Sequence, residues 1–231
     1  MIKPTDRFFA PIARWRAVAK RSVDIIGAAG LIPVMAPFWL GLMILIRLDS
    51  PGPVLFRQVR VGRQGRLFTL YKLRSMVHGA EDATGPVWAK DPDPRETRVG
   101  RFLRRYGLDE TMQLINILKG EMSFVGPRPE RPFFVEQLKH ELVGYSLRTL
   151  IKPGLTGWAQ VHMKRRYDLS VHDVRTKLVY DLEYIGRQSF CLDLLILLKT
   201  VTVFTGRRQS SEAPPSFSSA ARPSRKSVQV S

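Results

Sequence analysis

Residues 108–130 read LDETMQLINILKGEMSFVGPRPE, and this stretch is the most informative part of the chain. Two adjacent acids, Asp109 and Glu110, stand at the start of a short helical pattern that stops at Gly120. A stiff Gly-Pro-Arg-Pro turn follows and fixes the direction in which Arg128 projects. Free backbone N–H groups and the helix dipole at such a start favour ionised carboxylates. The stretch therefore predicts a charged site at a helix N-terminus.

The residue types of this site suit chemistry on a phosphate. An ionised Asp109 can be a nucleophile toward phosphorus, while Glu110 binds a divalent ion. Mg²⁺ is the expected metal, because all-oxygen ligands plus a substrate phosphate match its preference. Guanidinium groups nearby favour the same interpretation, since they bind phosphate through paired N–H groups. The structural alternative is that Asp109 merely caps the helix and Glu110 complements its dipole.

The chain as a whole is strongly basic. Its 231 residues include 37 Lys and Arg against 20 Asp and Glu, a formal net charge of +17. Such a charge implies an anionic partner, either nucleic acid, an anionic membrane surface or a phosphorylated substrate. The length allows one domain with a sizeable core. The single cysteine, Cys191, excludes an internal disulfide, and four scattered histidines argue against a zinc site.

An apolar segment near the N-terminus predicts a membrane helix. Residues 25–46 carry no charge, and as a straight helix they would extend about 33 Å, enough to cross a bilayer core. Pro33 and Pro37 lie in the middle and favour a break. Both flanks are basic, whereas a spanning helix has one basic end. We therefore prefer a re-entrant helix over residues 20–48, broken at Pro37, to a spanning one.

A cleaved signal peptide is the third interpretation of this segment. The apolar run exceeds the roughly 7–15 residues of a signal sequence. Residues 47–51, Arg-Leu-Asp-Ser-Pro, are also no small-residue cleavage site. The signal-peptide interpretation is therefore rejected.

The segment after the membrane helix predicts a small β-hairpin. Apolar and polar residues alternate over 54–61 and again over 67–76, and Arg-Gln-Gly at 63–65 makes the turn between them. Residues 81–96 contain three prolines and several acids, which indicates a loop. A short basic helix over 98–106 leads into the acidic pair.

The C-terminal half predicts further helices. Helical spacing covers 133–150 and 174–185, with a Pro-Gly break at 152–157 between them. Residues 190–204 are nearly all apolar but too few to span a bilayer, so they form either a core helix or one in the membrane interface. From residue 206 onward the chain is rich in Ser, Pro, Arg and Ala, and we expect disorder.

These elements predict an α+β fold that is mainly helical. It combines a re-entrant membrane helix broken at proline, a small β-hairpin, interfacial amphipathic helices and a disordered tail. The expected divisions are a basic N-terminal segment at 1–19, the re-entrant helix at 20–48, a catalytic domain on the cytoplasmic face at 49–205 and the tail at 206–231.

A series of short motifs then resembles a known family. The motifs occur in this order: Lys20-Arg21 before the apolar segment, Leu48-Asp49-Ser50-Pro51-Gly52-Pro53, Phe56-Arg57-Gln58, Val61-Gly62, Tyr71-Lys72-Leu73-Arg74-Ser75-Met76, Leu108-Asp109-Glu110, Gly126-Pro127-Arg128-Pro129 and Lys152-Pro153-Gly154-Leu155-Thr156-Gly157-Trp158-Ala159-Gln160-Val161. Together they resemble the bacterial sugar transferase family, the monotopic polyprenyl-phosphate phosphoglycosyl transferases. The match covers residues 18–203, and the collinear order makes it specific. The chain looks like the minimal, core-only form, similar to undecaprenyl-phosphate galactose or glucose phosphotransferases.

The resemblance implies a reaction and its partners. A nucleotide-sugar, usually a UDP-hexose, gives its phosphosugar to undecaprenyl phosphate, yielding undecaprenyl-diphosphate-sugar and UMP. Such enzymes work at the cytoplasmic face of the bacterial inner membrane, among membrane lipids, and begin exopolysaccharide or other surface glycan synthesis. Downstream glycosyltransferases are possible partners, and nucleic acid is not expected. The sequence does not specify the sugar or the pathway.

The resemblance also implies residue roles. Asp109 would be the nucleophile that forms a covalent phosphosugar intermediate, and Glu110, with Asp109, would hold Mg²⁺. Three basic residues align with cations that the family places around the metal and the phosphates: Lys72, Arg104 and Arg128.

Two departures from the family pattern matter. The helix break reads Ala36-Pro37 instead of Ser-Pro, so the hydroxyl near Pro37 is missing. The family's Asn-Gly-Arg after Gln-Val is replaced by His-Met-Lys-Arg-Arg. The phosphate-binding arginine of that motif falls on Lys164, with Arg165 beside it. Lysine keeps the charge but loses the bidentate fork, so either residue is expected to bind the substrate phosphate.

Two other functions compete with this one. A membrane-tethered nucleic-acid binder would explain the charge, but the basic residues are dispersed instead of forming a stripe with interleaved aromatics. A non-enzymatic anchor could hold anionic lipid with its basic face. It leaves the Asp109-Glu110 pair and the Pro-Arg-Pro turn unexplained.

Overall fold

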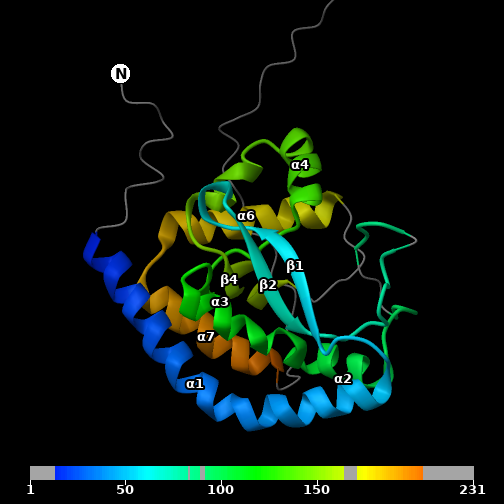
Figure 1. Cartoon of the computed structure of the whole chain (residues 1–231). Coiled ribbons are helices and arrows are strands. Elements are labelled where there is room, and N and C mark those ends of the chain that lie inside the picture. The colour runs from blue at the N-terminus through cyan, green and yellow to red at the C-terminus, as the bar shows by residue number, and fades with distance from the viewer. Residues whose placement is uncertain (1–13, 83, 89–91, 164–170, 205–231) are drawn as a thin grey trace, which may run out of the picture.

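The computed structural model describes residues 14–82, 84–88, 92–163 and 171–204. The fold is mainly helical (Figure 1), as predicted. Its elements are, in chain order, α1 (Arg14–Asp49), β1 (Leu55–Val61), η2 (Arg63–Gly65), β2 (Leu67–Leu73), α2 (Arg98–Tyr106), η3 (Leu108–Gln113), α3 (Leu114–Lys119), β3 (Ser123–Val125), α4 (Pro132–Glu141), η4 (Tyr145–Leu150), β4 (Gly154–Thr156), α5 (Trp158–His162), α6 (Val171–Arg187) and α7 (Phe190–Phe204).

The N-terminal helix α1 is longer than the sequence predicts and is not interrupted. It runs for 36 residues and contains both Pro33 and Pro37. The sequence predicts a break at Pro37, but the helix continues through both prolines and changes direction partway along its length (Figure 1). Each proline removes one backbone donor, and the intact bonds on either side keep the helix together as a bend. The re-entrant path through a membrane stays a prediction.

Beyond its prolines, α1 buries one stripe and exposes the rest. Trp39, Leu42 and Ile46 follow helical spacing and are buried in one core cluster with residues of β2, α2 and α3. Large apolar side chains on the remaining surface are exposed, Phe38 and Leu40 among them. Among the described residues, α1 is the one helix long and apolar enough to cross a membrane. An apolar surface of this size on a helix is suited to contact with lipid.

Polar side chains fix the first half of α1 to the domain. The Arg21 guanidinium donates to the carbonyls of Ile117 and Leu118 at the end of α3, at 2.6 and 2.8 Å. The Ile117 carbonyl also accepts from the Gly120 N–H at 2.9 Å, and Arg21 adds a side-chain cap at this end of α3. The buried Asp24 carboxylate accepts from the Ser123 hydroxyl and from a backbone N–H of β3, both at 3.0 Å. The helix is therefore held directly to the segment between the acidic turn and the Pro-Arg-Pro turn.

Two small sheets lie beside α1 and α3. The predicted hairpin is confirmed: β1 and β2 pair antiparallel from Leu55↔Leu73 to Val61↔Leu67. The second sheet, a parallel pair of β3 and β4, was not predicted. Gly154 allows this pairing, because a Cβ there would lie 2.1 Å from the Gly126 nitrogen. The pairing places the Gly-Pro-Arg-Pro turn beside the Lys-Pro-Gly turn.

The helices of the C-terminal half agree with the sequence in part. Helix α7 has the predicted bounds, and α6 is longer than the predicted 174–185. The predicted helix over 133–150 is wrong as one element: α4 ends at Glu141, Gly144 has a φ of 83°, and η4 follows. The terminal segments 1–13 and 205–231 lie outside the described residues, so the expected disordered tail stays a prediction.

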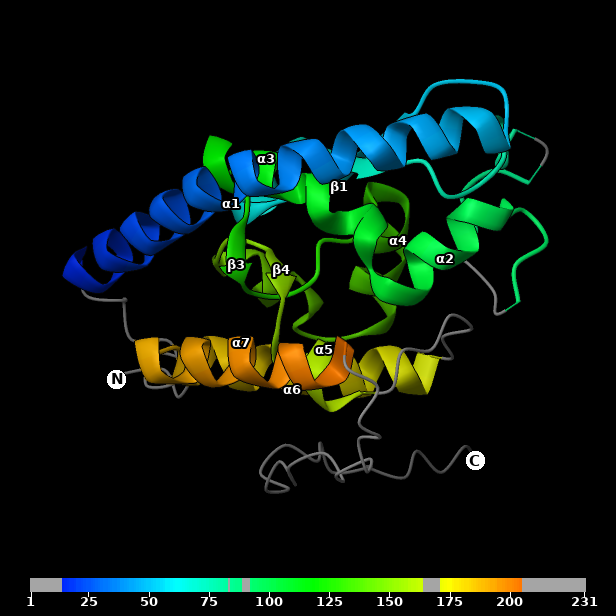
Figure 2. The ribbon, with the colours of Figure 1, turned by 90° about the horizontal axis from the view of Figure 1, so that it is seen from below.

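Helices α1 and α7 run along opposite sides of the domain (Figure 2), with α3, β3 and β4 between them. At their N-terminal ends, Lys20 of α1 and Asp193 of α7 form an ion pair at 2.5 Å. Helix α7 buries Ile196 and exposes Leu194, Leu195 and Leu198. It is therefore a core helix along one stripe, and its place in a membrane interface stays a prediction.

Candidate active site

The acidic pair lies in a tight turn between two helices. Gly107, at φ 65°, ends α2 and begins the 3₁₀ turn η3, whose first turn contains both Asp109 and Glu110. Glu110 N donates to the Gly107 carbonyl at 3.2 Å. Asp109 was expected at or near the cap, and it lies near the cap as the second residue of η3, after the N-cap Gly107 and Leu108. Both carboxylates are buried, with 5% and 8% of their residue surfaces exposed.

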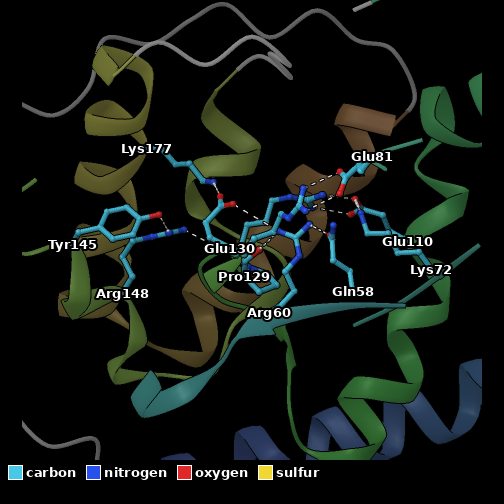
Figure 3. Close-up of polar contacts among 12 residues, drawn as sticks. Gln58, Arg60, Lys72, Glu81, Glu110, Pro129, Glu130, Tyr145, Arg148 and Lys177 are labelled. Atoms are coloured by element: carbon cyan, nitrogen blue, oxygen red, sulfur yellow. Dashed lines mark hydrogen bonds and ion pairs between the residues drawn. The ribbon is translucent and has the colours of Figure 1, made fainter. Parts of the chain in front are cut away.

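Two cations from distant parts of the chain meet the Glu110 carboxylate (Figure 3). Lys72 of β2 places its Nζ 2.9 Å from Glu110 Oε1. Arg128 of the Gly-Pro-Arg-Pro turn bonds with both guanidinium nitrogens, Nη1 to Oε2 at 2.7 Å and Nη2 to Oε1. The sequence named all three residues, and the structure brings them together.

The charges of this trio determine the protonation of Glu110. Burial disfavours the charged form of Glu110, but Arg128 and Lys72 outweigh burial and hold its pKa well below the ordinary glutamate value. Burial also lowers the pKa of Lys72, against the opposing effect of Glu110. The pKa of Arg128 is raised, chiefly by Glu110. Glu110 is therefore an anion at neutral pH. Its negative charge in turn favours the protonated forms of Lys72 and Arg128.

Backbone carbonyls of the Pro-Arg-Pro turn are held by two further arginines that the sequence did not single out. Arg148 of η4 donates through Nη2 to the carbonyl of Arg128 at 2.9 Å. Arg60 of β1 donates through Nη1 to the carbonyl of Pro129 at 3.0 Å. These bonds fix the backbone from which the Arg128 side chain projects. Nothing in the sequence identified the acceptor of Arg60.

Behind the turn lies a second buried ionic cluster (Figure 3). Glu130 pairs with Lys177 of α6 at 2.5 Å and with Arg60 at 3.7 Å. Burial opposes the charge of Glu130, but Lys177, Arg148 and Arg60 lower its pKa to about 2. Arg148 also pairs with the buried Asp181 at 2.7 Å. Through Arg148 and Arg60, this cluster supports the backbone of the Pro-Arg-Pro turn. The pairing of its residues could not be predicted from a single sequence.

The remaining predicted phosphate contacts are placed only in part. Arg104 lies in the last turn of α2, and its Nε is 2.7 Å from Glu96 Oε1. Its phosphate contact therefore stays a prediction. Lys164 and Arg165 lie outside the described residues.

The donor atoms at the turn can be tested against the expected Mg²⁺. Within the described ranges, no group of three or more His, Cys, Asp and Glu side chains could hold a metal ion alone. Asp109 and Glu110 offer two buried, adjacent carboxylates. Mg²⁺ in proteins is commonly bound by one or two carboxylates together with substrate phosphates. The residues therefore fit an ion that binds jointly with a phosphorylated substrate.

The chain matches known proteins over most of its length. The family model described as bacterial sugar transferase matches residues 15–207. A UDP-N-acetylgalactosamine-undecaprenyl-phosphate N-acetylgalactosaminephosphotransferase of Aeromonas hydrophila is 44% identical over 191 residues, which cover 82% of this chain and 44% of that protein. A UDP-glucose:undecaprenyl-phosphate glucose-1-phosphate transferase of Escherichia coli is 39% identical over 196 residues, covering 85% and 42%.

For a shorter relative, the alignment covers most of both proteins. The UDP-glucose:undecaprenyl-phosphate glucose-1-phosphate transferase of Caulobacter vibrioides is 42% identical over 182 residues, which are 79% of this chain and 68% of that protein. The chain spans less than half of the length of the Aeromonas and Escherichia proteins.

Proposed function

This chain belongs to the bacterial sugar transferase family, and we propose from that membership that it is a polyprenyl-phosphate phosphoglycosyl transferase. It transfers a phosphosugar from a nucleotide-sugar, a UDP-hexose, to undecaprenyl phosphate. The observation that carries the proposal is the buried Asp109-Glu110 turn whose second carboxylate is held by Arg128 and Lys72. A buried acid beside fixed cations suits a substrate that carries a diphosphate.

The reaction proceeds in two displacements at the same phosphorus. A carboxylate oxygen of Asp109 attacks the phosphorus that bears the sugar, and the bond from that phosphorus to the oxygen of the leaving UMP breaks. A phosphate oxygen of undecaprenyl phosphate then attacks the same phosphorus and displaces Asp109. The products are undecaprenyl-diphosphate-sugar and UMP, and the Asp109 carboxylate is restored.

Glu110 serves the reaction by staying ionised next to the nucleophile. Its low pKa, set by Arg128 and Lys72 against burial, keeps it in the charged form that a metal ligand requires at neutral pH. Together with Asp109 it would hold Mg²⁺, which when bound neutralises phosphate charge and polarises a phosphoryl oxygen. Arg128 and Lys72 add positive charge at the same place, where the leaving UMP gains negative charge.

The membrane helix gives the enzyme access to its lipid substrate. The exposed apolar surface of α1 fits lipid contact, and the basic residues on both of its flanks favour a helix that enters and leaves on the cytoplasmic face of the inner membrane. The relatives' names refer to UDP-N-acetylgalactosamine and UDP-glucose, which supports a donor among UDP-hexoses and their N-acetyl forms. The lipid product would pass to downstream glycosyltransferases of a surface glycan.

The proposal is tested by product release. Purified protein is incubated with undecaprenyl phosphate, Mg²⁺ and a panel of UDP-sugars, and UMP is measured. We expect UMP from at least one donor, none from Asp109→Asn, and normal release from the matched surface variant Asp82→Asn, since Asp82 is exposed. Removing divalent ions with a chelator should stop the reaction, and added Mg²⁺ should restore it. No UMP from any donor, or full activity in Asp109→Asn, would contradict the proposal.

A further inference from the structure

One hydrogen bond connects the apolar helix to the acidic turn itself. The indole Nε1 of Trp39 in α1 donates to the Oγ1 of Thr111 at 2.9 Å. Thr111 is the residue directly after Glu110, and Trp39 is buried, with 6% of its surface exposed. The bond therefore joins a helix suited to lipid contact with the residue adjoining the two acids.

The Thr111 hydroxyl connects this bond to both sides of the acidic pair. Its Oγ1 accepts from Trp39 and donates to the carbonyl of Leu108 at 2.7 Å. A hydroxyl has one donor and two acceptor positions, so both bonds can form together. Leu108 and Thr111 flank Asp109 and Glu110 in the chain, and the hydroxyl closes the turn across them.

The backbone of η3 gives the turn limited support, although Arg128 and Lys72 also hold the Glu110 side chain. It is a 3₁₀ turn of six residues, a geometry with weaker hydrogen bonds than an α-helix. Its N-cap residue Gly107 offers no side-chain capping bond. The bond from Glu110 N to the Gly107 carbonyl is long, at 3.2 Å. Side-chain support from Thr111, and through it from Trp39, therefore matters more here than in a regular helix.

The helix segment that carries Trp39 is itself anchored. Arg74 after β2 donates from Nη2 to the Ser50 carbonyl at 2.6 Å and to the Ile46 carbonyl at 3.3 Å. Leu42 and Ile46 pack in the same core as Trp39. A residue on an anchored helix restrains the position of the group to which it is hydrogen-bonded. A freely moving residue could not do so.

We propose that Trp39 is a positioning residue for the acidic pair: its indole N–H, acting through the Thr111 hydroxyl, holds the turn that presents Asp109 and Glu110. The roles of the two acids rest on the proposed function, whereas the tether is a property of the fold. The geometry of the turn thereby depends on the position of α1 against the domain. A small displacement of a nucleophile lowers the reaction rate much more than it lowers the affinity for substrate.

The test removes the N–H donor while keeping an aromatic ring at the position. In Trp39→Phe, we expect kcat to fall about tenfold while KM changes by less than about twofold. The matched control is Trp15→Phe, because Trp15 lies on the same helix, is 68% exposed and should leave both constants unchanged. A Trp39→Phe variant with the kcat of the wild type would overturn the proposal.

Variants of Thr111 separate positioning from packing. Thr111→Val removes the hydroxyl at similar volume and should lower kcat, whereas Thr111→Ser keeps the hydroxyl and should stay within about twofold of the wild type. If Trp39 acts through Thr111, the double variant Trp39→Phe/Thr111→Val is no slower than Thr111→Val alone. Losses that add fully would overturn the proposal, since they would assign Trp39 an independent packing effect.

A readout without substrate distinguishes failure of the tether from failure of the proposed function. Hydrogen–deuterium exchange of a peptide covering residues 107–113 should be faster in Trp39→Phe than in Trp15→Phe and the wild type. Unchanged exchange there overturns the tether. Absence of UMP release from the wild type with every donor would contradict the proposed function, and the exchange result would still decide the tether.

Discussion

Arg128 bonds to Glu110 with both terminal nitrogens, and its Nη1 lies 2.7 Å from Glu110 Oε2. The two residues are 18 positions apart, and Arg128 projects from a turn whose carbonyls are held by Arg148 and Arg60. The fork is thus oriented by the backbone beneath it and not only by its partner. This geometry underlies the first two predictions.

Replacing Arg128 by Lys should lower kcat/KM about 100-fold. Lysine retains the charge but not the planar fork, so it cannot bond to both Glu110 oxygens at once. UMP release with a saturating metal concentration measures the effect. Arg187→Lys is the matched control, because Arg187 forms an exposed ion pair with Glu183 and should give wild-type rates. Equal activity of both variants would show that charge alone is needed.

The acid limb of the pH–rate profile should shift to higher pH in Arg128→Gln. In the wild type, Arg128 and Lys72 keep the pKa of Glu110 well below 4.5, so Glu110 stays ionised as pH falls through the mildly acidic range. Without Arg128, burial dominates and the pKa of Glu110 rises, so protonation and loss of activity begin at higher pH. Rates in Arg128→Gln should therefore decline at a pH where the wild type is unaffected. An unmoved limb would show that Glu110 does not control it.

Glu130 should contribute stability that acid removes. Its folded pKa is about 2 against an ordinary value of 4.5, so its contribution is fully present above pH 4.5 and is lost as pH falls toward 2. The shift corresponds to about 3 kcal/mol for this buried group. The melting temperature of Glu130→Gln should be well below that of the wild type at pH 7, and the difference should shrink by pH 3. Glu136→Gln, on an exposed part of α4, is the control, and a gap that does not shrink with pH would contradict the assignment.

Both ends of α1 should be accessible from the cytoplasmic side. In a Cys191→Ser background, single cysteines are introduced by Arg16→Cys and Arg57→Cys, at exposed positions before and after the apolar part of the helix. A membrane-impermeant maleimide should label both in inside-out vesicles and neither in intact spheroplasts. Labelling of position 16 alone from the outside would show that the helix spans the membrane.

Local patterns in the sequence predicted much of the fold. The hairpin followed from alternation on either side of the 63–65 turn, and α2 and α7 have the predicted bounds because each is set off by polar or Gly-containing segments. The β3–β4 pair escaped prediction because three-residue strands are too short to show a period, and their pairing joins residues 31 positions apart, Ser123 to Gly154. The sequence predicted a break in α1 because proline removes a backbone donor. The helix bends instead, since tertiary contacts can keep a helix intact across a missing hydrogen bond.

The sequence predicted the acidic pair and the cations that contact it, but not the residues that hold them in place. Asp109, Glu110, Lys72 and Arg128 are recognisable because short motifs carry them. Arg148, Arg60 and Glu130 act on the backbone or charge of that group through partners that lie far away along the chain. A single sequence contains no signal for such pairs. The bond from Trp39 to Thr111 is of the same kind, since it joins positions 72 residues apart.

The bond between Asp24 and β3 has a consequence for biosynthesis. Asp24 leaves the ribosome 100 residues before Phe124, whose backbone N–H it binds. At roughly 5–20 residues per second, the carboxylate waits about 5–20 s for that partner. A bare carboxylate deep in hydrocarbon costs about 2.5–3.5 kcal/mol on insertion scales. If α1 enters a membrane as proposed, we expect its nascent N-terminal half to stay near the headgroups during translation and to take its final place only after the ribosome has delivered the strand whose donors bind Asp24.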